Sequence, residues 1–502
     1  MVEKPPNCKQ GAFGRLGSDG AGCCPEGKQL TSNSDELAFT SATEQAALIR
    51  QRKLSPVELV ELYLRHIEQL DPTLNCFVLA TGDEALEQAR IAEEALTQGV
   101  ELPPFHGVPI SIKDILSTAG VRTTRGSRAF AHDVPEYDDN DVARLKAAGF
   151  IMLGKTNTPE FAIYPWTEPE LFGPTRNPWD TNLTPGGSTG GGGAALAAGL
   201  CPVSEGTDGG GSIRCPASCN GVFGIKPSRG RVSCAPRFGE LIGGLMTSGP
   251  LTRTVKDSAG VLDAISGYVA GDPYWAPVPE RSLVEEVGRD PGHLRVGMVT
   301  SSSLGEVHAD CVAAAEDAAA LLEELGHFVS PIELGLTEDL VHDFQTVWFA
   351  SLAATKVPDW DKTERKTKEQ ADLGRRVQAL EYLQAKAALQ RFSRRLVSMW
   401  EEYDLLLTPT LAEPPFQIGT PESFPAEEMV KERFKFSPFT PVFNVTGQPA
   451  VSLPLWWNGG GLPIGVQLAG PPAGEAVLIR VSFQLEQASP WQSRRPLIAA
   501  TS

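Results

Sequence analysis

Two glycine-rich loops that each carry a serine, together with one lysine, have the residue types needed for nucleophilic chemistry. Ser188 lies in Gly-Gly-Ser-Thr-Gly-Gly-Gly-Gly, and Ser212 follows 24 residues later in Gly-Thr-Asp-Gly-Gly-Gly-Ser-Ile-Arg. Lys113 ends the apolar run Pro-Ile-Ser-Ile-Lys. A hydrolase without a histidine needs a base, a relay hydroxyl, a nucleophile and unobstructed backbone N–H donors, which these segments supply together. Taken singly, each has a plainer interpretation, as a turn or as a solvated lysine.

Two other motifs compete with this constellation. Residues 149–156, Gly-Phe-Ile-Met-Leu-Gly-Lys-Thr, fit the phosphate-loop pattern, but the residues between the glycines favour a buried strand and Pro159 follows soon after. Residues 186–190 fit the Gly-x-Ser-x-Gly nucleophile elbow, which requires a hydrophobic strand directly before it. Polar loop residues, 180–185, precede it instead, and none of the seven histidines has a distinctive local pattern. Neither motif therefore predicts a nucleotide site or a serine–histidine hydrolase.

The elements that must position the lysine and the serines alternate between strand and helix patterns. Short buried strands are predicted at 108–113, 150–153 and 294–300, and helices at 55–70, 83–98, 141–148, 194–199 and 310–325. Ser55-Pro56-Val57-Glu58 marks the start of the first helix. This alternation favours an α/β sheet in a single large domain. A long helical stretch interrupted at Gly374 is expected over 364–400, a surface loop over 411–441, and strands and a final helix after Asn444.

Composition narrows the classes of partner. The 502 residues carry a net charge of −18 with a sequence pI near 5.0, and nucleic acids or anionic membranes would require a basic face. No apolar run reaches the roughly 20 residues of a membrane span. The nine cysteines include no metal-type Cys-x-x-Cys pair, so we interpret them as reduced structural thiols. We expect a cytoplasmic protein with no metal and no cofactor, preceded by a flexible leader over residues 1–34 whose role the sequence leaves open.

Eight segments together resemble the amidase signature family of hydrolases, from about Glu36 to Pro496. They are SPVELVELYLRHIE, HGVPISIKD, GKTNTPEFA, FGPTRNPWD, TPGGSTGG, GTDGGGSIRCPA, GIKPSRGRVS and FNVTGQPAVSLPL with GLPIGVQLAG. The resemblance implies an α/β fold in which a central mixed β-sheet is covered by helices on both faces. It also implies one catalytic domain over 35–496, with a variable substrate loop around 411–441.

The resemblance assigns roles to particular residues. Lys113, Ser188 and Ser212 align with the family's lysine base, relay serine in a cis peptide and nucleophilic serine; Lys155 matches a family segment that is not catalytic. The N–H groups of Gly209, Gly210 and Gly211 would then stabilise the oxyanion. A lysine base requires a lowered pKa, which burial can supply, whereas the adjacent Asp114 favours the charged form.

Three further residues flank this set, and Gly209 within it departs from the family pattern. Asp208 and Arg214 are interpreted as a structural pair. Thr189 stands where the family usually has a second serine, so its extra methyl must fit. Gly209 replaces a bulkier residue, which predicts a freer loop and a wider acyl pocket.

The implied activity is hydrolysis of carboxamide C–N bonds through an acyl-enzyme, with side activity toward esters and carbamates. Tyr164, Trp166, Phe344, Trp348 and Phe416 suggest an aromatic pocket, although core packing explains them equally well, and no basic cluster indicates a carboxylate substrate. The expected partner is a small-molecule amide, ester or carbamate, and the expected state a monomer or homodimer. The alternative is the A subunit of a glutamyl-tRNA amidotransferase, against which the sequence GKTNTPEFA argues.

Overall fold

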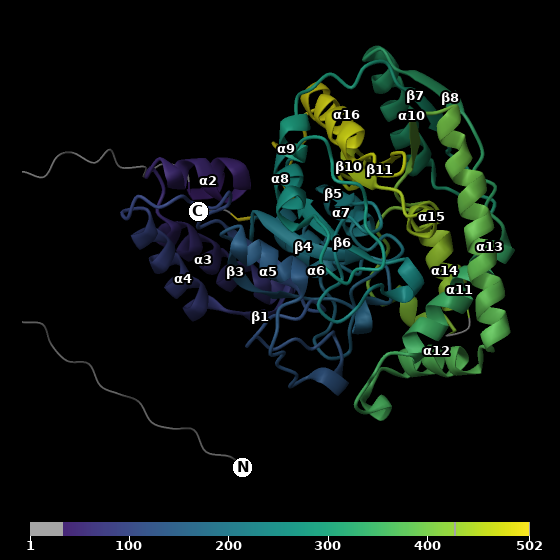
Figure 1. Cartoon of the computed structure of the whole chain (residues 1–502), viewed down its shortest axis with the longest axis horizontal. Coiled ribbons are helices and arrows are strands. Elements are labelled where there is room, and N and C mark those ends of the chain that lie inside the picture. The colour runs from purple at the N-terminus through teal and green to yellow at the C-terminus, as the bar shows by residue number, and fades with distance from the viewer. Residues whose placement is uncertain (1–33, 426–427, 501–502) are drawn as a thin grey trace, which may run out of the picture.

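The computed structural model describes residues 34–425 and 428–500, which Figure 1 shows as a central sheet with helices around it. The predicted leader lies almost wholly outside the described residues, since the first helix begins at Ser34. The strands are β1 Phe77–Ala80, β2 Pro109–Lys113, β3 Ile151–Thr156, β4 Val203–Asp208, β5 Phe223–Lys226, β6 Thr247–Thr252, β7 Arg295–Met298, β8 Phe328–Pro331, β9 Leu405–Pro409, β10 Ala450–Trp457 and β11 Pro463–Ala469. The helices are α1 Ser34–Phe39, α2 Ala42–Arg50, α3 Pro56–Leu74, α4 Gly82–Ala95, α5 Asn140–Ala147, α6 Gly190–Ala197, α7 Arg214–Asn220, α8 Val255–Ile265, α9 Leu283–Glu286, α10 Ala309–Glu324, α11 Glu338–Ala353, α12 Arg365–Arg376, α13 Ala379–Val397, α14 Met429–Phe436, α15 Thr440–Thr446 and α16 Glu475–Ala488.

The eleven strands found within the described residues form one mixed sheet, which confirms the predicted α/β class. Their order is β1-β3-β2-β4-β6-β5-β10-β11-β9-β7-β8. β2 runs parallel to both β3 and β4, whereas β4 pairs antiparallel with β6. Figure 1 shows α11, α12 and α13 as an arm along one side of the sheet and α2, α3 and α4 on the opposite side. The parallel trio β3-β2-β4 matters most for function, because the loops that follow β2 and β4 leave the same edge.

Local sequence signals account for the elements around that trio. Every residue of β2, β3 and β4 is buried, as expected for strands covered on both faces. The phosphate-loop look-alike is therefore the strand β3. Helix α3 starts where its signals predicted, with the Ser55 side chain accepting from the N–H groups of Val57 and Glu58 and with Pro56 at the first position.

Two expectations about the second half of the chain are wrong. Gly374 does not interrupt the helix: it lies inside α12, where a Cβ atom would come within 2.0 Å of the Phe349 carbonyl oxygen. The glycine lets α12 pack closely on α11, and the break comes at residues 377–378. Region 411–441 is not a plain surface loop, because it contains α14, whose Met429, Val430 and Phe434 are buried.

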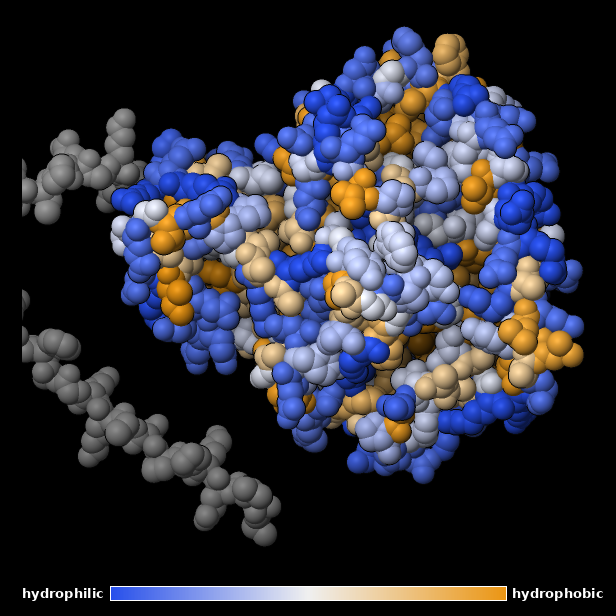
Figure 2. Space-filling model, viewed as in Figure 1, coloured by the Kyte–Doolittle hydropathy of each residue, from blue (hydrophilic) through white to orange (hydrophobic). Residues whose placement is uncertain are grey.

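Figure 2 shows a hollow with hydrophobic side chains at its base, opening beside the α11–α12 arm. No helix in the described ranges is long and apolar enough to cross a membrane. Within the same ranges, no cluster of His, Cys, Asp or Glu side chains has the arrangement of a metal site. The six cysteines for which the structure gives a state are free thiols: Cys76, Cys201, Cys215, Cys219, Cys234 and Cys311.

Candidate active site

Lys113 is the last residue of β2, and its amine is completely buried between neighbouring strands. Its Nζ donates to Ser188 Oγ at 2.7 Å and to Thr207 Oγ1 at 3.0 Å. Thr207 comes from β4, the parallel neighbour of β2, so strand pairing brings this hydroxyl to the lysine. The sequence analysis missed Thr207, although it lies one residue before Asp208 in the second glycine-rich segment.

Burial sets the protonation of Lys113. Removal from water lowers the pKa of its amine to about 7, against the opposing influence of the Glu205 and Asp208 carboxylates. Asp114, which we expected to favour the charged form, instead accepts from the N–H and hydroxyl of Thr124. A neutral amine at this position can accept a proton near neutral pH.

Ser188 follows a cis peptide bond from Gly187 and lies two residues before the start of α6. Gly187 has no room for a side chain, because a Cβ atom there would lie 2.6 Å from the backbone nitrogen of Trp166. The Ser188 side chain is fully buried and is held by the lysine. The close packing of Gly187 on the Trp166 backbone and the hydrogen bond from Lys113 together hold the Ser188 hydroxyl between Lys113 and the second loop.

Ser212 lies in that second loop, between β4 and α7, and is 9% exposed. It lines a pocket together with Gly210 and Gly211. Its backbone carbonyl accepts from the N–H of Thr189, the residue after Ser188, which ties the two loops together at 3.2 Å. Within residues 34–425 and 428–500, the Ser212 hydroxyl makes no hydrogen bond, so the loop presents it to the pocket without a protein partner.

The three glycines predicted as oxyanion donors are not equivalent. The N–H of Gly211 donates to Asp208 Oδ1 at 2.7 Å, so it is already paired. Gly211 has a φ of +129°, and a Cβ atom there would meet the Thr440 hydroxyl at 2.3 Å. In the described part of the chain, the N–H groups of Gly210 and Ser212 meet no acceptor. Within the described residues the N–H of Gly209 also has no acceptor, so Gly209, Gly210 and Ser212 supply the free donors in this loop.

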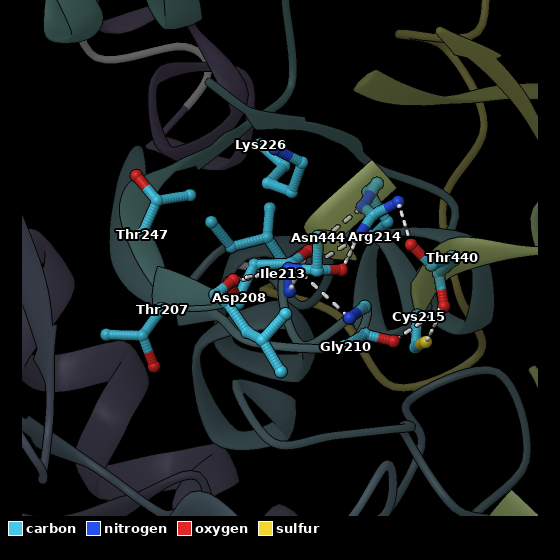
Figure 3. A network of polar contacts seen from close by, with 12 residues as sticks. Thr207, Asp208, Gly210, Ile213, Arg214, Cys215, Lys226, Thr247, Thr440 and Asn444 are labelled. Carbon is cyan, nitrogen blue, oxygen red and sulfur yellow. Dashed lines mark hydrogen bonds and ion pairs between the residues drawn. The ribbon is translucent and has the colours of Figure 1, made fainter. Parts of the chain in front are cut away.

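An ion pair beneath the loop holds this geometry (Figure 3). Arg214 donates to both Asp208 carboxylate oxygens, at 3.0 and 2.8 Å, and both side chains are fully buried. Arg214 also donates to the Thr440 carbonyl and the Asn444 side chain. Burial would raise the pKa of Asp208, but Arg214 and Lys226 outweigh it and hold that pKa well below its ordinary range. The charged pair therefore anchors both ends of the serine loop.

Breaking this pair should unfold the protein more readily. Asp208→Ala leaves the Arg214 charge buried and two N–H groups, those of Gly211 and Ile213, without acceptors. We expect the free energy of unfolding to fall by about 3–5 kcal/mol in urea denaturation. The matched control, Glu369→Gln, breaks an exposed pair with Arg365 and should cost about 1 kcal/mol or less. Equal losses in the two variants would contradict the anchoring role.

The two departures from the family pattern have structural explanations. The hydroxyl of Thr189 lies 3.5 Å from the Thr207 carbonyl and does not reach Lys113. The methyl group of Thr189 fits because Gly206 has no side chain. A Cβ atom on Gly206 would lie 2.5 Å from Thr189 Cγ2. Gly209 does not widen the acyl pocket. A Cβ atom placed on Gly209 would already lie 3.4 Å from the side chains of Trp348 and Ile242, which fill that space.

Aromatic residues wall the pocket, but only some of those predicted. Tyr164, Phe344 and Trp348 line it. Trp166 instead stacks on the outer side of Tyr164, with ring centroids 5.1 Å apart, and Phe416 packs against Phe436. The sequence analysis also missed one wall residue, the arginine Arg433 on α14.

A second, larger cavity of about 740 Å³ adjoins the first. Ile163 and Trp348 border both spaces, and Thr207 lies in the wall of the larger one. None of the seven histidines borders either space. Lys155, the rival lysine, donates to the Leu116 carbonyl and the Thr118 hydroxyl and not to either serine.

Comparison with known proteins identifies the family of this chain. Residues 58–479 match the family model described as Amidase. The chain belongs to the amidase signature family, whose members are hydrolases that act on amide C–N bonds. A curated family member, the 6-aminohexanoate-cyclic-dimer hydrolase of Paenarthrobacter ureafaciens, is 35% identical over 91% of this chain and 96% of its own length.

Solved structures from the family superpose over nearly the whole fold. A 6-aminohexanoate cyclic dimer hydrolase complexed with its substrate gives a TM-score of 0.86 at 34% identity, covering 92% of this chain and 100% of that one. A bacterial aryl acylamidase of the amidase signature family gives 0.85 at 27% identity with the same coverage. The glutamyl-tRNA(Gln) amidotransferase protein of Thermotoga maritima, the A-type component of that enzyme, gives 0.76 at 28% identity, covering 93% and 99%. By TM-score, these two hydrolases are nearer to this chain than the amidotransferase subunit.

Proposed function

We propose that this protein is a stand-alone serine amidohydrolase of small carboxamides that uses Lys113, Ser188 and Ser212. The observation that carries the proposal is the 2.7 Å hydrogen bond from the buried Lys113 amine to Ser188, beside a pocket lined by Ser212. Lysine, hydroxyl and second hydroxyl in this order give a proton path that needs no histidine. The family's activity on amide bonds agrees with that chemistry.

In the first half-reaction, Ser212 Oγ attacks the amide carbonyl carbon and its proton passes to Ser188. Ser188 in turn gives its own proton to neutral Lys113, so the lysine becomes charged as the oxyanion forms. The oxyanion would accept from the N–H groups of Gly210 and Ser212 and from Gly209, whereas Gly211 stays with Asp208. Lys113 then returns the proton through Ser188 to the departing amine.

In the second half-reaction, water replaces the amine. It attacks the acyl carbon of the Ser212 ester and gives a proton to Ser188, which passes its own to Lys113. When the C–Oγ bond breaks and the acid leaves, Lys113 returns this proton through Ser188 to Ser212 Oγ. The same donors stabilise the oxyanions of esters and carbamates, so cleavage of both is a proposed side activity. The pocket and the adjoining cavity offer separate spaces for the acyl and amine groups.

The test is an assay of the purified chain alone against a 4-nitroanilide, a 4-nitrophenyl ester and an aryl carbamate. We expect turnover of all three, the ester fastest because its leaving group is the best. Turnover by this chain with no other protein present would separate this function from the amidotransferase alternative. Cleavage of the ester without the anilide would contradict an amidase, and activity that requires further protein components would support the alternative.

A further inference from the structure

Arg433 lies in the wall of the Ser212 pocket without a charged partner. It belongs to α14 and borders the same space as Gly210, Gly211 and Ser212, while only 8% of its surface is exposed. Its guanidinium lies over the Tyr164 ring, 4.7 Å from the centroid, and 5.9 Å from that of Trp348. The cation is therefore desolvated and surrounded by aromatic surface next to the reacting serine.

The hydrogen bonds of Arg433 leave its charge uncompensated. Nη2 donates to the neutral amide oxygen of Gln370 at 2.8 Å, while Nε is buried with no acceptor. No carboxylate lies within 4.0 Å of the guanidinium among residues 34–425 and 428–500. Burial lowers its pKa to about 10, so the group is still protonated at neutral pH.

The other buried arginines of the described residues have carboxylate partners or several backbone acceptors. Arg214 pairs with Asp208, and Arg231 donates to both oxygens of Glu475. Arg253 has no carboxylate partner but donates to four backbone carbonyls. Arg433 has only neutral partners, the Gln370 amide oxygen and the Tyr164 hydroxyl, and it is the one of these four that faces a pocket. A buried cation is normally paired, so the missing acceptor points to the ligand.

We propose that Arg433 binds a carboxylate carried by the amide substrate, so that this pocket selects anionic amides. The inference rests on the proposed function, since it places the carboxylate next to the carbonyl that Ser212 attacks. A planar guanidinium matches a carboxylate with two parallel hydrogen bonds, and the rings of Tyr164, Phe344 and Trp348 keep water from weakening them.

Matched substrate pairs test this proposal. Succinic, glutaric and adipic mono-4-nitroanilides are compared with the neutral butanoyl, pentanoyl and hexanoyl anilides, and 4-acetamidobenzoate with acetanilide for the amine side. We expect the carboxylate member of at least one pair to have a kcat/KM about ten- to a hundredfold higher, mainly through KM. In Arg433→Met that ratio should fall to about one. Equal rates within every pair, or a preference that survives in Arg433→Met, would overturn the proposal.

Two further variants keep the test sharp. Lys435→Met removes an equal charge from the same helix, where Lys435 pairs with Glu432, and should retain the preference. Gln370→Glu leaves Arg433 in place but gives it a carboxylate partner, so it should abolish the preference even if Arg433→Met does not fold. Preference retained in Gln370→Glu, or lost in Lys435→Met, would count against Arg433.

Binding to Ser212→Ala separates this inference from the proposed function. Calorimetry with the adipic and hexanoyl anilides should show tighter binding of the anion, and adding Arg433→Met should remove the difference. Selective binding of the anion without Ser212-dependent turnover would support the anion site and contradict the amidase mechanism. Ser212-dependent turnover with no preference for the anion in either the kinetic or the binding assay would support the amidase mechanism and contradict the anion site.

Discussion

Ser212→Ala lowers kcat/KM for an anilide by roughly 10⁴- to 10⁶-fold, as expected when the nucleophile of a covalent mechanism is removed. The variant should fold normally, because the Ser212 hydroxyl bonds to no described group and its loss leaves no buried partner unpaired. The measurement is steady-state hydrolysis together with a thermal melt of the same sample. Loss of activity with an unchanged melt separates chemistry from stability.

Ser218→Ala is the matched control for that experiment. Ser218 is also buried, on α7, but its hydroxyl accepts from the N–H of Gly465 and does not border the pocket. Its loss should therefore cost stability and leave most of the activity. If Ser212→Ala keeps its activity while Ser188→Ala loses it, the nucleophile is Ser188 and the order of the relay is reversed.

Lys113→Met should lower kcat by about 10³-fold, within the range that a positioned general base contributes. Methionine fills much of the buried volume but cannot accept the proton that Ser188 passes on. The control is Lys155→Met, which removes an equally buried lysine that donates to Leu116 and Thr118. That variant should lose stability but keep most of the activity that depends on Lys113, Ser188 and Ser212.

The pH dependence of kcat/KM in the native protein gives a further prediction from the assignment of Lys113 as the base. Lys113 must be neutral to accept a proton, and its pKa is about 7. As pH falls through 7 the amine takes up a proton, so kcat/KM should fall about tenfold per pH unit below the midpoint and level off above it. The profile should persist in Lys155→Met and disappear from the residual activity of Lys113→Met. A midpoint above pH 9 would contradict a buried neutral lysine.

The catalytic candidates could be named from the sequence because local segments carry suitable residue types and the family resemblance assigns their roles. Lys113 ends an apolar run that forms β2, and Ser212 follows a strand that pairs with it in parallel, so both come to one edge of the sheet. The glycine clusters mark places where another backbone approaches closely, as at Gly187. The glycine runs are visible in one sequence, although the contact that excludes a side chain at Gly187 comes from Trp166, 21 residues earlier.

The remaining features depend on contacts between distant segments. Arg433 borders the pocket only because α14 packs against α11, and nothing in its neighbourhood in the sequence distinguishes it from Lys431 or Lys435. Gly374 looked like a helix end, yet it serves close packing on Phe349. The pairing of the Gly211 N–H with Asp208 joins residues only three apart, but it follows from the turn that the loop makes and not from its composition.

Intact-mass spectrometry of the enzyme during turnover of a slowly deacylated ester tests the central claim most directly. The account predicts a mass increase of one acyl group, located by peptide mapping on Ser212, that is absent in Ser212→Ala and accumulates more slowly in Lys113→Met. An acyl group on Ser188, or turnover with no adduct when the reaction is quenched within its first cycle, would contradict a covalent mechanism through Ser212.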